Sequence, residues 1–381
     1  MISRIKNIRG NKTLWSAIFA LALFSFWPNY TTSSNPAYLY GDGNTSLILI
    51  KHAFHLFFGF IIIFLVHRID YNYYKRISVI MVLVIIILLT ITLFFGTSVN
   101  SASRWIRIGG VSFQTSAFAI YVSMMYTAAF LSKKNGVYNN FKECLYLLIP
   151  LAVIVLLVFP SNLSTAMLIF ISNLTLMLIG KFPFKYMFRI IGSTCVIALI
   201  FFLMINVFSD YGPVRAKTWS NRISSFINGD TNETYQSNGA MEAVKLGGWF
   251  GIGPGKSTMK NFLPQSFSDF IFAIITEESG LVGAIVLILL YIGILHKSVQ
   301  TAVKIKDTFG MLLVMGMILP IIFQAVIHIG VVVGIFPVTG QPLPLMSSGG
   351  SAIWATCIAL GVILGVSKHV VTKNKVKEVN V

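Results

Sequence analysis

Charged residues are scarce in this sequence. Only 11% of its 381 residues are Asp, Glu, Lys or Arg, whereas 56% are hydrophobic. A soluble domain carries about 25% charged residues, so the composition excludes an ordinary soluble protein and indicates an integral membrane protein. The chain has 3 cysteines, Cys144, Cys195 and Cys357, in or beside apolar runs and without metal-ligand spacing. A packing role is therefore predicted for them, and a disulfide framework is not.

The sequence also lacks a complete phosphate-binding loop motif and a signal-peptide cleavage site. The segment GGWFGIGPGKS, residues 247–257, resembles a phosphate-binding loop, but Phe250 stands where that motif requires glycine and no predicted strand precedes it. We therefore expect a flexible, tightly turning loop end whose backbone amides can still approach an anion. The first apolar run is followed by no convincing cleavage site, so we interpret it as a retained helix.

Apolar runs of about 20 residues recur along the chain, and each is long enough to cross a hydrocarbon core of about 30 Å. The predicted fold is an all-α polytopic membrane protein, because the alternating strands of a β-barrel would not give such continuous runs. About ten transmembrane helices are predicted, near residues 13–28, 47–66, 77–96, 113–132, 143–159, 163–180, 187–208, 270–295, 309–333 and 350–367.

The basic residues predict the orientation, because short cytoplasmic loops are enriched in Lys and Arg. Most of the 29 Lys and Arg residues fall in alternate connections when the amino terminus is placed inside. Both termini are then cytoplasmic, within one transmembrane domain over 1–381. A basic tail at 368–381 lies inside, and a large loop at 209–269, between helices 7 and 8, is extracytoplasmic. The net charge of +17 is thus mainly topological, and no nucleic-acid partner is predicted.

Several basic residues fall in the loops predicted to be exported, where the enrichment of Lys and Arg in cytoplasmic loops would not place them. Arg104 lies in the loop SASRWIRIGG, and the large loop contains Arg222, Lys256 and Lys260. An anionic ligand such as a phosphate or pyrophosphate lipid headgroup would explain them. Contact with ordinary anionic phospholipid, or pairing with acids of the same loop, is the alternative.

Three carboxylates stand in the stretch LPQSFSDFIFAIITEESG, residues 263–280. A carboxylate at the bilayer centre costs at least about 2.5 kcal/mol, so all three should face a bundle interior or a watered cavity. Glu277 and Glu278 lie about two turns deeper than Asp269 and are predicted to be buried structural acids that tie the helix to its neighbours. Asp269 lies at the exported mouth, where a helix N-cap and a catalytic base are both open interpretations.

The turn GIFPVTGQPLPLMSSGGSA, residues 334–352, is dense in proline and glycine and has no charge. Such a backbone is tolerated at membrane depth only where it packs on protein or lines a cavity. We expect it to form a wall of the same pocket, with Ser347 and Ser351 as substrate-binding candidates.

Three motifs in order resemble those of the SEDS family (shape, elongation, division and sporulation): RWIRIGGVSFQTS at 104–116, the glycine-rich run to EESG at 247–280, and PVTGQPLPLMSSGGS at 337–351. The resemblance covers nearly the whole chain, and the segment GQPLPLMSS and the compact length favour an FtsW-like over a RodA-like member. It implies a peptidoglycan glycosyltransferase that polymerises lipid II at the outer face of the bacterial cytoplasmic membrane. The family's essential acid corresponds to Asp269.

The chain departs from the family in several places. The family commonly reads QPSE followed by Lys three positions later, whereas this sequence has QTSA at 114–117, so Ala117 replaces the acid and Ile120 the base. Asn162 and Ser164 replace the Asp and Gly of the family's Pro-Asp-Leu-Gly-Thr, and Gln265 replaces the Glu of its Leu-Pro-Glu. These changes leave Asp269 intact but weaken any transfer of the family's fourth-helix site.

The resemblance also implies a mechanism and partners. Asp269 would act as general base while Arg104, Arg222, Lys260 and, less strongly, Lys256 stabilise the departing lipid pyrophosphate. No cofactor is required, although a divalent cation, Mg or Mn, is left open as a bridge between Asp269 and the pyrophosphate. The implied partners are undecaprenyl-pyrophosphate-linked glycan, a class B penicillin-binding protein transpeptidase and other divisome or elongasome proteins. A lipid II flippase and a non-catalytic divisome scaffold are the alternative functions.

Overall fold

The chain forms a bundle of long helices. The structure is a computed structural model that describes residues 10–40, 45–99, 102–108, 111–138, 140–207 and 232–379. Its long helices are α2 (Lys12–Tyr40), α3 (Thr45–Val66), α4 (Tyr71–Phe95), α5 (Thr115–Lys134), α6 (Phe141–Val158), α7 (Leu163–Ile179), α8 (Phe184–Val207), α11 (Ile271–Lys304), α12 (Thr308–Val332) and α13 (Gly350–Val379). The predicted all-α membrane fold is confirmed.

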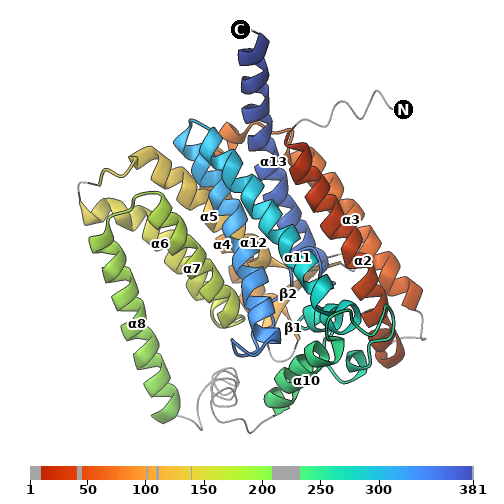
Figure 1. Ribbon diagram of the computed structural model, residues 1–381. Coiled ribbons are helices and arrows are strands. Elements are labelled where there is room, and N and C mark those ends of the chain that lie inside the picture. Colours follow the sequence, from red (N-terminus) through yellow and green to blue (C-terminus); the bar gives the residue numbers. More distant parts are fainter. Residues whose placement is uncertain are drawn as a thin grey trace.

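Seven helices of the described part are long and apolar enough to cross a membrane, namely α3, α4, α5, α6, α11, α12 and α13, and α7 is a shorter apolar helix. Helices α5, α12 and α13 are the most buried of the seven, while α3, α4 and α6 turn most of their side chains outward. Figure 1 shows α8 at the edge of the bundle and α10 (Asn232–Gly247) at the end opposite the carboxyl terminus.

Helix α2 is longer than the run 13–28 that the sequence predicts. It continues through Pro28 and the polar run TTSS to Tyr40. The hydroxyl of Thr32 donates to the carbonyl oxygen of Pro28 at 2.8 Å, and that of Ser34 to Thr31 at 2.9 Å. Because these side chains bond back to their own helix, a polar run can lie within it.

A small antiparallel sheet, which the sequence analysis did not predict, joins α4 to α5. Its strands are β1 (Thr97–Val99), β2 (Ala102–Ile108) and β3 (Val111–Gln114), in that spatial order. Trp105 pairs with Gln114, and Arg107 pairs with Ser112. The amide of Gln114 donates to Ser351 Oγ at 3.1 Å, so the sheet is tied to the start of α13.

Helix α11 is broken at Gly280, whose φ of 65° and ψ of −165° are not helical. The break leaves backbone groups of α11 without their helical hydrogen-bond partners, and the glycine-rich segment after α10 supplies partners for them. Amides of Ile252 and Gly253 donate to the carbonyl oxygens of Glu277 and Glu278, and amides of Leu281 and Val282 donate to those of Gly248 and Trp249, at 2.9–3.2 Å. Irregular backbone at membrane depth needs such internal partners. The segment 248–253 is therefore a fixed part of the helical bundle, and the expectation of a flexible loop end is wrong.

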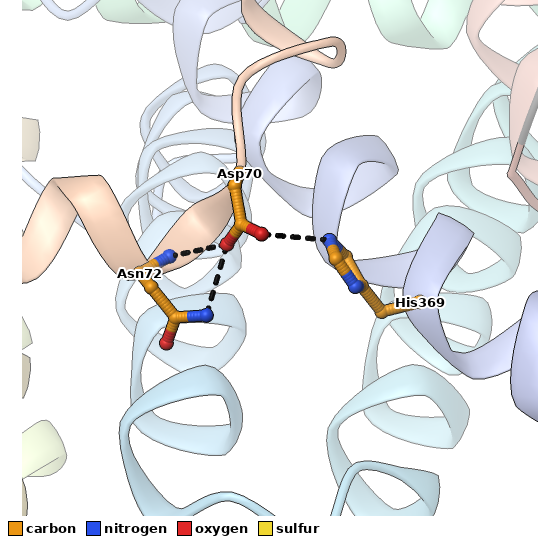
Figure 2. Close-up of polar contacts among 3 residues, drawn as sticks. All are labelled: Asp70, Asn72 and His369. Atoms are coloured by element: carbon orange, nitrogen blue, oxygen red, sulfur yellow. Dashed lines mark hydrogen bonds and ion pairs between the residues drawn. The ribbon is translucent and has the colours of Figure 1, made fainter.

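The first and last described helices meet at the other end of the bundle. The amide of Asn11 donates to Ser367 Oγ on α13 at 3.1 Å. Figure 2 shows Asp70, which caps α4, accepting from the amide and side chain of Asn72, with its second oxygen 3.9 Å from His369 Nε2 on α13. The start of α2 and the part of α13 near residues 367–369 thus lie at the same end of the bundle. The orientation in the membrane stays a prediction.

Candidate functional site

Asp269 lies in a turn directly before α11. Its amide donates to the carbonyl oxygen of Gln265 at 3.0 Å, and its Oδ1 accepts from the hydroxyl of Ser268 at 2.8 Å. The side chain is half-buried. Gly340, at φ 64°, lies so close that a Cβ there would come 3.3 Å from Asp269 Oδ2. The carboxylate therefore lies between this turn and the segment that joins α12 to α13.

The start of α11 bears on the N-cap interpretation of Asp269. The residue at the N-cap position is Phe270, and Asp269 precedes it. The amide of Phe272, in the first turn, donates to His328 Nε2 on α12 at 3.4 Å. His328 Nδ1 lies 2.8 Å from the carbonyl oxygen of Gln341. Because a carbonyl only accepts, we place the proton on Nδ1, which leaves Nε2 to accept from Phe272. A histidine on another helix thus serves the first turn of α11.

The segment between α12 and α13 packs on protein from Gln341 to Ser347, whereas Ile335 and Phe336 are exposed. Gln341 is buried and its side chain donates to Thr165 Oγ1 on α7 at 2.9 Å. The amide of Thr165 in turn donates to Asn162 Oδ1, which caps α7. Asn162 is the residue that the resemblance aligns with a family Asp, and it still serves as the N-cap here, since Asn caps a helix about as well as Asp.

Ser347 and Ser351 are both buried and hydrogen-bonded to backbone. Ser347 Oγ donates to the carbonyl oxygen of Ser268 at 2.7 Å and accepts from the amide of Leu343 at 2.8 Å. Ser351 Oγ accepts from the amide of Gln114. Both serines therefore stabilise the backbone around Asp269 and the start of α13. Their role in binding substrate stays a prediction.

Glu277 and Glu278 are buried, with relative exposures of 0% and 1%. Glu277 Oε1 accepts from the amides of Thr258 and Met259 at 2.9 and 3.2 Å, and its Oε2 accepts from the hydroxyl of Ser257. Glu278 accepts from the amide of Ser257 and from the hydroxyl of Thr31 on α2, each at 3.1 Å. The anions that the loop amides bind are therefore the chain's own carboxylates, and this pair connects α11 to α2 and to residues 257–259 of the loop.

The predicted cationic residues are placed differently from one another. Lys256 is exposed on the glycine-rich loop. Lys260, on the short 3₁₀ helix η1 (Met259–Asn261), is half-buried and close enough to Glu278 to interact with its carboxylate electrostatically. Arg222 lies in 208–231, outside the described residues.

Arg104 is on β2, where its Nε donates to the carbonyl oxygen of Ser161 at 2.7 Å. It lines a small pocket of about 10 Å³, room for roughly one water molecule. The same pocket is lined by four residues that carry hydroxyls and by three leucines, namely Thr92, Thr115, Ser116, Ser161, Leu89, Leu93 and Leu157. Arg104 thus joins the sheet to the connection between α6 and α7.

Sequence reasoning missed His328, Gln341, Thr165 and Asn29 as members of this constellation. Asn29 is buried on α2 and donates to the carbonyl oxygen of Met346 at 2.7 Å. The only available signal was a polar side chain inside an apolar run, as at His328 in IIFQAVIHIG. Among the described residues, no group of three or more His, Cys, Asp and Glu side chains is placed to hold a metal ion.

Comparisons with known proteins agree with this architecture. A family model of cell cycle proteins, FtsW/RodA/SpoVE, matches residues 11–372. The chain is 32% identical, over 82% of its length and 88% of the relative, to the probable peptidoglycan glycosyltransferase FtsW of Buchnera aphidicola. It is 29% identical, over 82% of its length and 84% of the relative, to stage V sporulation protein E of Bacillus subtilis.

Solved structures resemble the fold over most of the chain. A chain of a peptidoglycan synthase complex, described as coordinating polymerization and crosslinking, aligns over 94% of this chain and 97% of its own length, with a TM-score of 0.75 at 21% identity. The rod shape determining protein RodA of Thermus thermophilus aligns over 94% and 96%, with a TM-score of 0.66 at 21% identity. At this identity the likeness concerns the fold.

Proposed function

Because the chain belongs to the FtsW/RodA/SpoVE family of cell cycle proteins, we propose that it is a peptidoglycan glycosyltransferase that polymerises lipid II into glycan strands. Its relatives' names, peptidoglycan glycosyltransferase FtsW and stage V sporulation protein E, support an enzyme of cell wall synthesis. The chain is a multi-pass membrane protein, and the outer face of the bacterial cytoplasmic membrane is the proposed place of reaction.

The placement of Asp269 carries this proposal. Its carboxylate is half-buried in the turn before α11, accepts from the hydroxyl of Ser268, and lies against Gly340 of the segment between α12 and α13. A base must be held within reach of the proton it removes while substrate can still approach. Glu277 and Glu278 are fully buried and accept hydrogen bonds from the loop. Asp269 is only half-buried, so of the three carboxylates it is the one that suits this role.

The proposed reaction needs one base. Asp269 removes the proton of the acceptor sugar hydroxyl, and that oxygen attacks the anomeric carbon of the donor as the lipid pyrophosphate leaves. An α-linked donor giving a β-linked product is an inversion, so direct displacement suffices and no covalent enzyme intermediate forms. Arg104, Arg222, Lys256 and Lys260 are the proposed cations for the departing pyrophosphate.

The reaction as proposed requires no cofactor. A divalent ion, Mg or Mn, is left open: Asp269 would be one of its ligands, and the ion would stabilise the charge of the leaving pyrophosphate. A class B penicillin-binding protein transpeptidase is the proposed partner, supported by the likeness to a chain of a peptidoglycan synthase complex. The FtsW and SpoVE relatives favour a role in division or sporulation over elongation.

The test is the Asp269→Asn exchange, which keeps side-chain size and capping ability but removes the base. Purified wild type and variant, matched for thermal stability in detergent, are incubated with lipid II, and glycan strands are measured. A positioned base contributes about 10²–10⁴-fold, so near-complete loss of polymer is expected. Polymerisation within about threefold of wild type, far from that loss, would show that Asp269 is not the base.

The same preparation separates the alternative functions. A flippase would redistribute lipid II across a vesicle without making polymer, and a scaffold would do neither. Redistribution without polymer in the wild-type protein would replace the proposed function with transport.

A further inference from the structure

A buried amide on the first long helix reaches the turn that carries Asp269. Asn29 lies on α2 with 2% of its surface exposed, about 240 residues before Asp269 in the chain. We propose that Asn29 is a positioning residue for Asp269, acting through the serine pair Ser347–Ser348. This inference rests on the proposed function, since it assumes that Asp269 is the base.

The amide of Asn29 uses both its donors and its acceptor. Its Nδ2 donates to the carbonyl oxygens of Ser25, one turn earlier on α2, and of Met346, each at 2.7 Å. Its Oδ1 accepts from the hydroxyl of Ser348. A single side chain therefore bonds to two residues of the segment between α12 and α13, Met346 and Ser348, which flank Ser347.

Ser347 and Ser348 connect the residues that Asn29 contacts to the turn before α11. The amide of Ser348 donates to the carbonyl oxygen of Phe267 at 3.1 Å, and the hydroxyl of Ser347 donates to that of Ser268 at 2.7 Å. Ser268 is the residue whose own hydroxyl donates to Asp269 Oδ1. Two adjacent peptide carbonyls beside the base are thus bonded by two adjacent serines. Asn29 bonds to Ser348 directly and to the carbonyl oxygen of Met346, the residue before Ser347.

This arrangement suits positioning of a catalytic group. A reacting group misplaced by about 1 Å can lose about 10²-fold in rate, and supporting side chains whose donors and acceptors are all used hold such a group most firmly. Asp269 lies in a turn rather than in a helix, so its own backbone gives less support than a helix would. The contacts of Asn29 add support for this turn from α2, a long helix.

Asn29 also contacts α3, which gives a competing explanation. Its Nδ2 lies 3.4 Å from His52 Nε2, and Ser25 Oγ lies 2.9 Å from the same atom. A purely structural role would be to hold α2 against α3. The two roles use different partners, because Ser25 contacts His52 and has no described contact with the serine pair.

The experiment compares Asn29→Ala, Ser348→Ala, their double variant and the control Ser25→Ala in the purified full-length protein. The readouts are kcat and KM for lipid II, with kcat expressed per lipid II-binding molecule so that unfolded protein does not count. We expect kcat to fall about tenfold or more in Asn29→Ala and Ser348→Ala, with KM within about twofold, because substrate contacts are kept. The fall in kcat of the double variant should be no larger than that of the worse single variant, because both substitutions break the same hydrogen-bonded connection. Ser25→Ala should keep kcat and lose only thermal stability.

Several results would overturn the inference. Unchanged kcat in Ser348→Ala, which removes one half-buried hydroxyl and leaves the α2–α3 contacts in place, would do so even if Asn29→Ala fails to fold. Losses that multiply in the double variant, or an equal loss in Ser25→Ala, would assign the effect to helix packing. An active Asp269→Asn protein would instead overturn the proposed function, and this is measured separately.

Discussion

At the scale of single residues, the planar guanidinium of Arg104 is a better-placed phosphate candidate than the exposed ammonium of Lys256. Its Nε bond to the carbonyl oxygen of Ser161 fixes the plane of the group, and an oriented guanidinium recognises phosphate through paired donors. Lys256 projects from a loop with its side chain exposed, so binding phosphate would require it to lose more rotamer freedom.

The prediction for Arg104→Ala follows from this geometry. Losing a charge-assisted contact to phosphate costs about 1.5–3 kcal/mol, which is about 10–150-fold in kcat/KM for lipid II. Arg104→Lys should retain part of the activity, because it keeps the charge but loses the Nε bond to Ser161. The measurement is kcat/KM with purified protein.

Arg107 is the matched control on the same strand. It is exposed and lies three residues further along β2. Arg107→Ala should change kcat/KM by less than Arg104→Ala does. Equal effects of the two exchanges would indicate a general attraction for anionic lipid and remove Arg104 from the site.

At the scale of elements, the break in α11 determines where the glycine-rich loop after α10 can lie. Gly280 is nine residues after Ile271, which at 1.5 Å per residue places the break about 13 Å along the helix. The loop meets it there through the four backbone hydrogen bonds described above, and the carboxylates of Glu277 and Glu278 anchor the next residues of the loop. The loop that precedes Asp269 is therefore held from inside the bundle.

Gly280→Ala should destabilise the protein strongly. A Cβ at this position would overlap the carbonyl oxygen of Trp249, and φ of 65° is strained for alanine. Neither the loop backbone nor the helix can move away without losing the bonds that satisfy the break, so a loss of at least about 2 kcal/mol is expected. Thermal unfolding in detergent measures it.

Gly293 offers the comparison on the same helix. A Cβ there meets no atom within 4 Å, and alanine is the better helix former, so Gly293→Ala should be neutral or stabilise by up to about 1 kcal/mol. If Gly280→Ala were equally harmless, the loop would not be bonded into the helix break.

At the scale of the whole molecule, the apolar runs and their order were predictable, because hydrophobicity along a helix is a local property of the sequence. Other features depend on contacts between distant residues. The break at Gly280 requires carbonyl and amide partners about 30 residues away, and the link from Asn29 to Ser348 joins positions 319 residues apart. The length of α2 was underestimated because its polar residues bond within the helix. Polar side chains in apolar runs mark these sites, but their partners become evident only in the fold.

The orientation of the whole bundle decides whether Asp269 can meet an exported lipid-linked substrate, and cysteine labelling tests it. Val137, between α5 and α6, is 65% exposed and is predicted to be cytoplasmic, whereas Phe262, near the site, is 57% exposed and predicted to be exported. Cys144 and Cys357 are buried, so replacing the exposed Cys195 by serine gives a background of low reactivity. A membrane-impermeant maleimide should label Phe262→Cys but not Val137→Cys in cells with an intact cytoplasmic membrane, and the reverse in inverted vesicles. The opposite pattern would put Asp269 on the cytoplasmic side, where a polymerase that releases strands into the wall could not work.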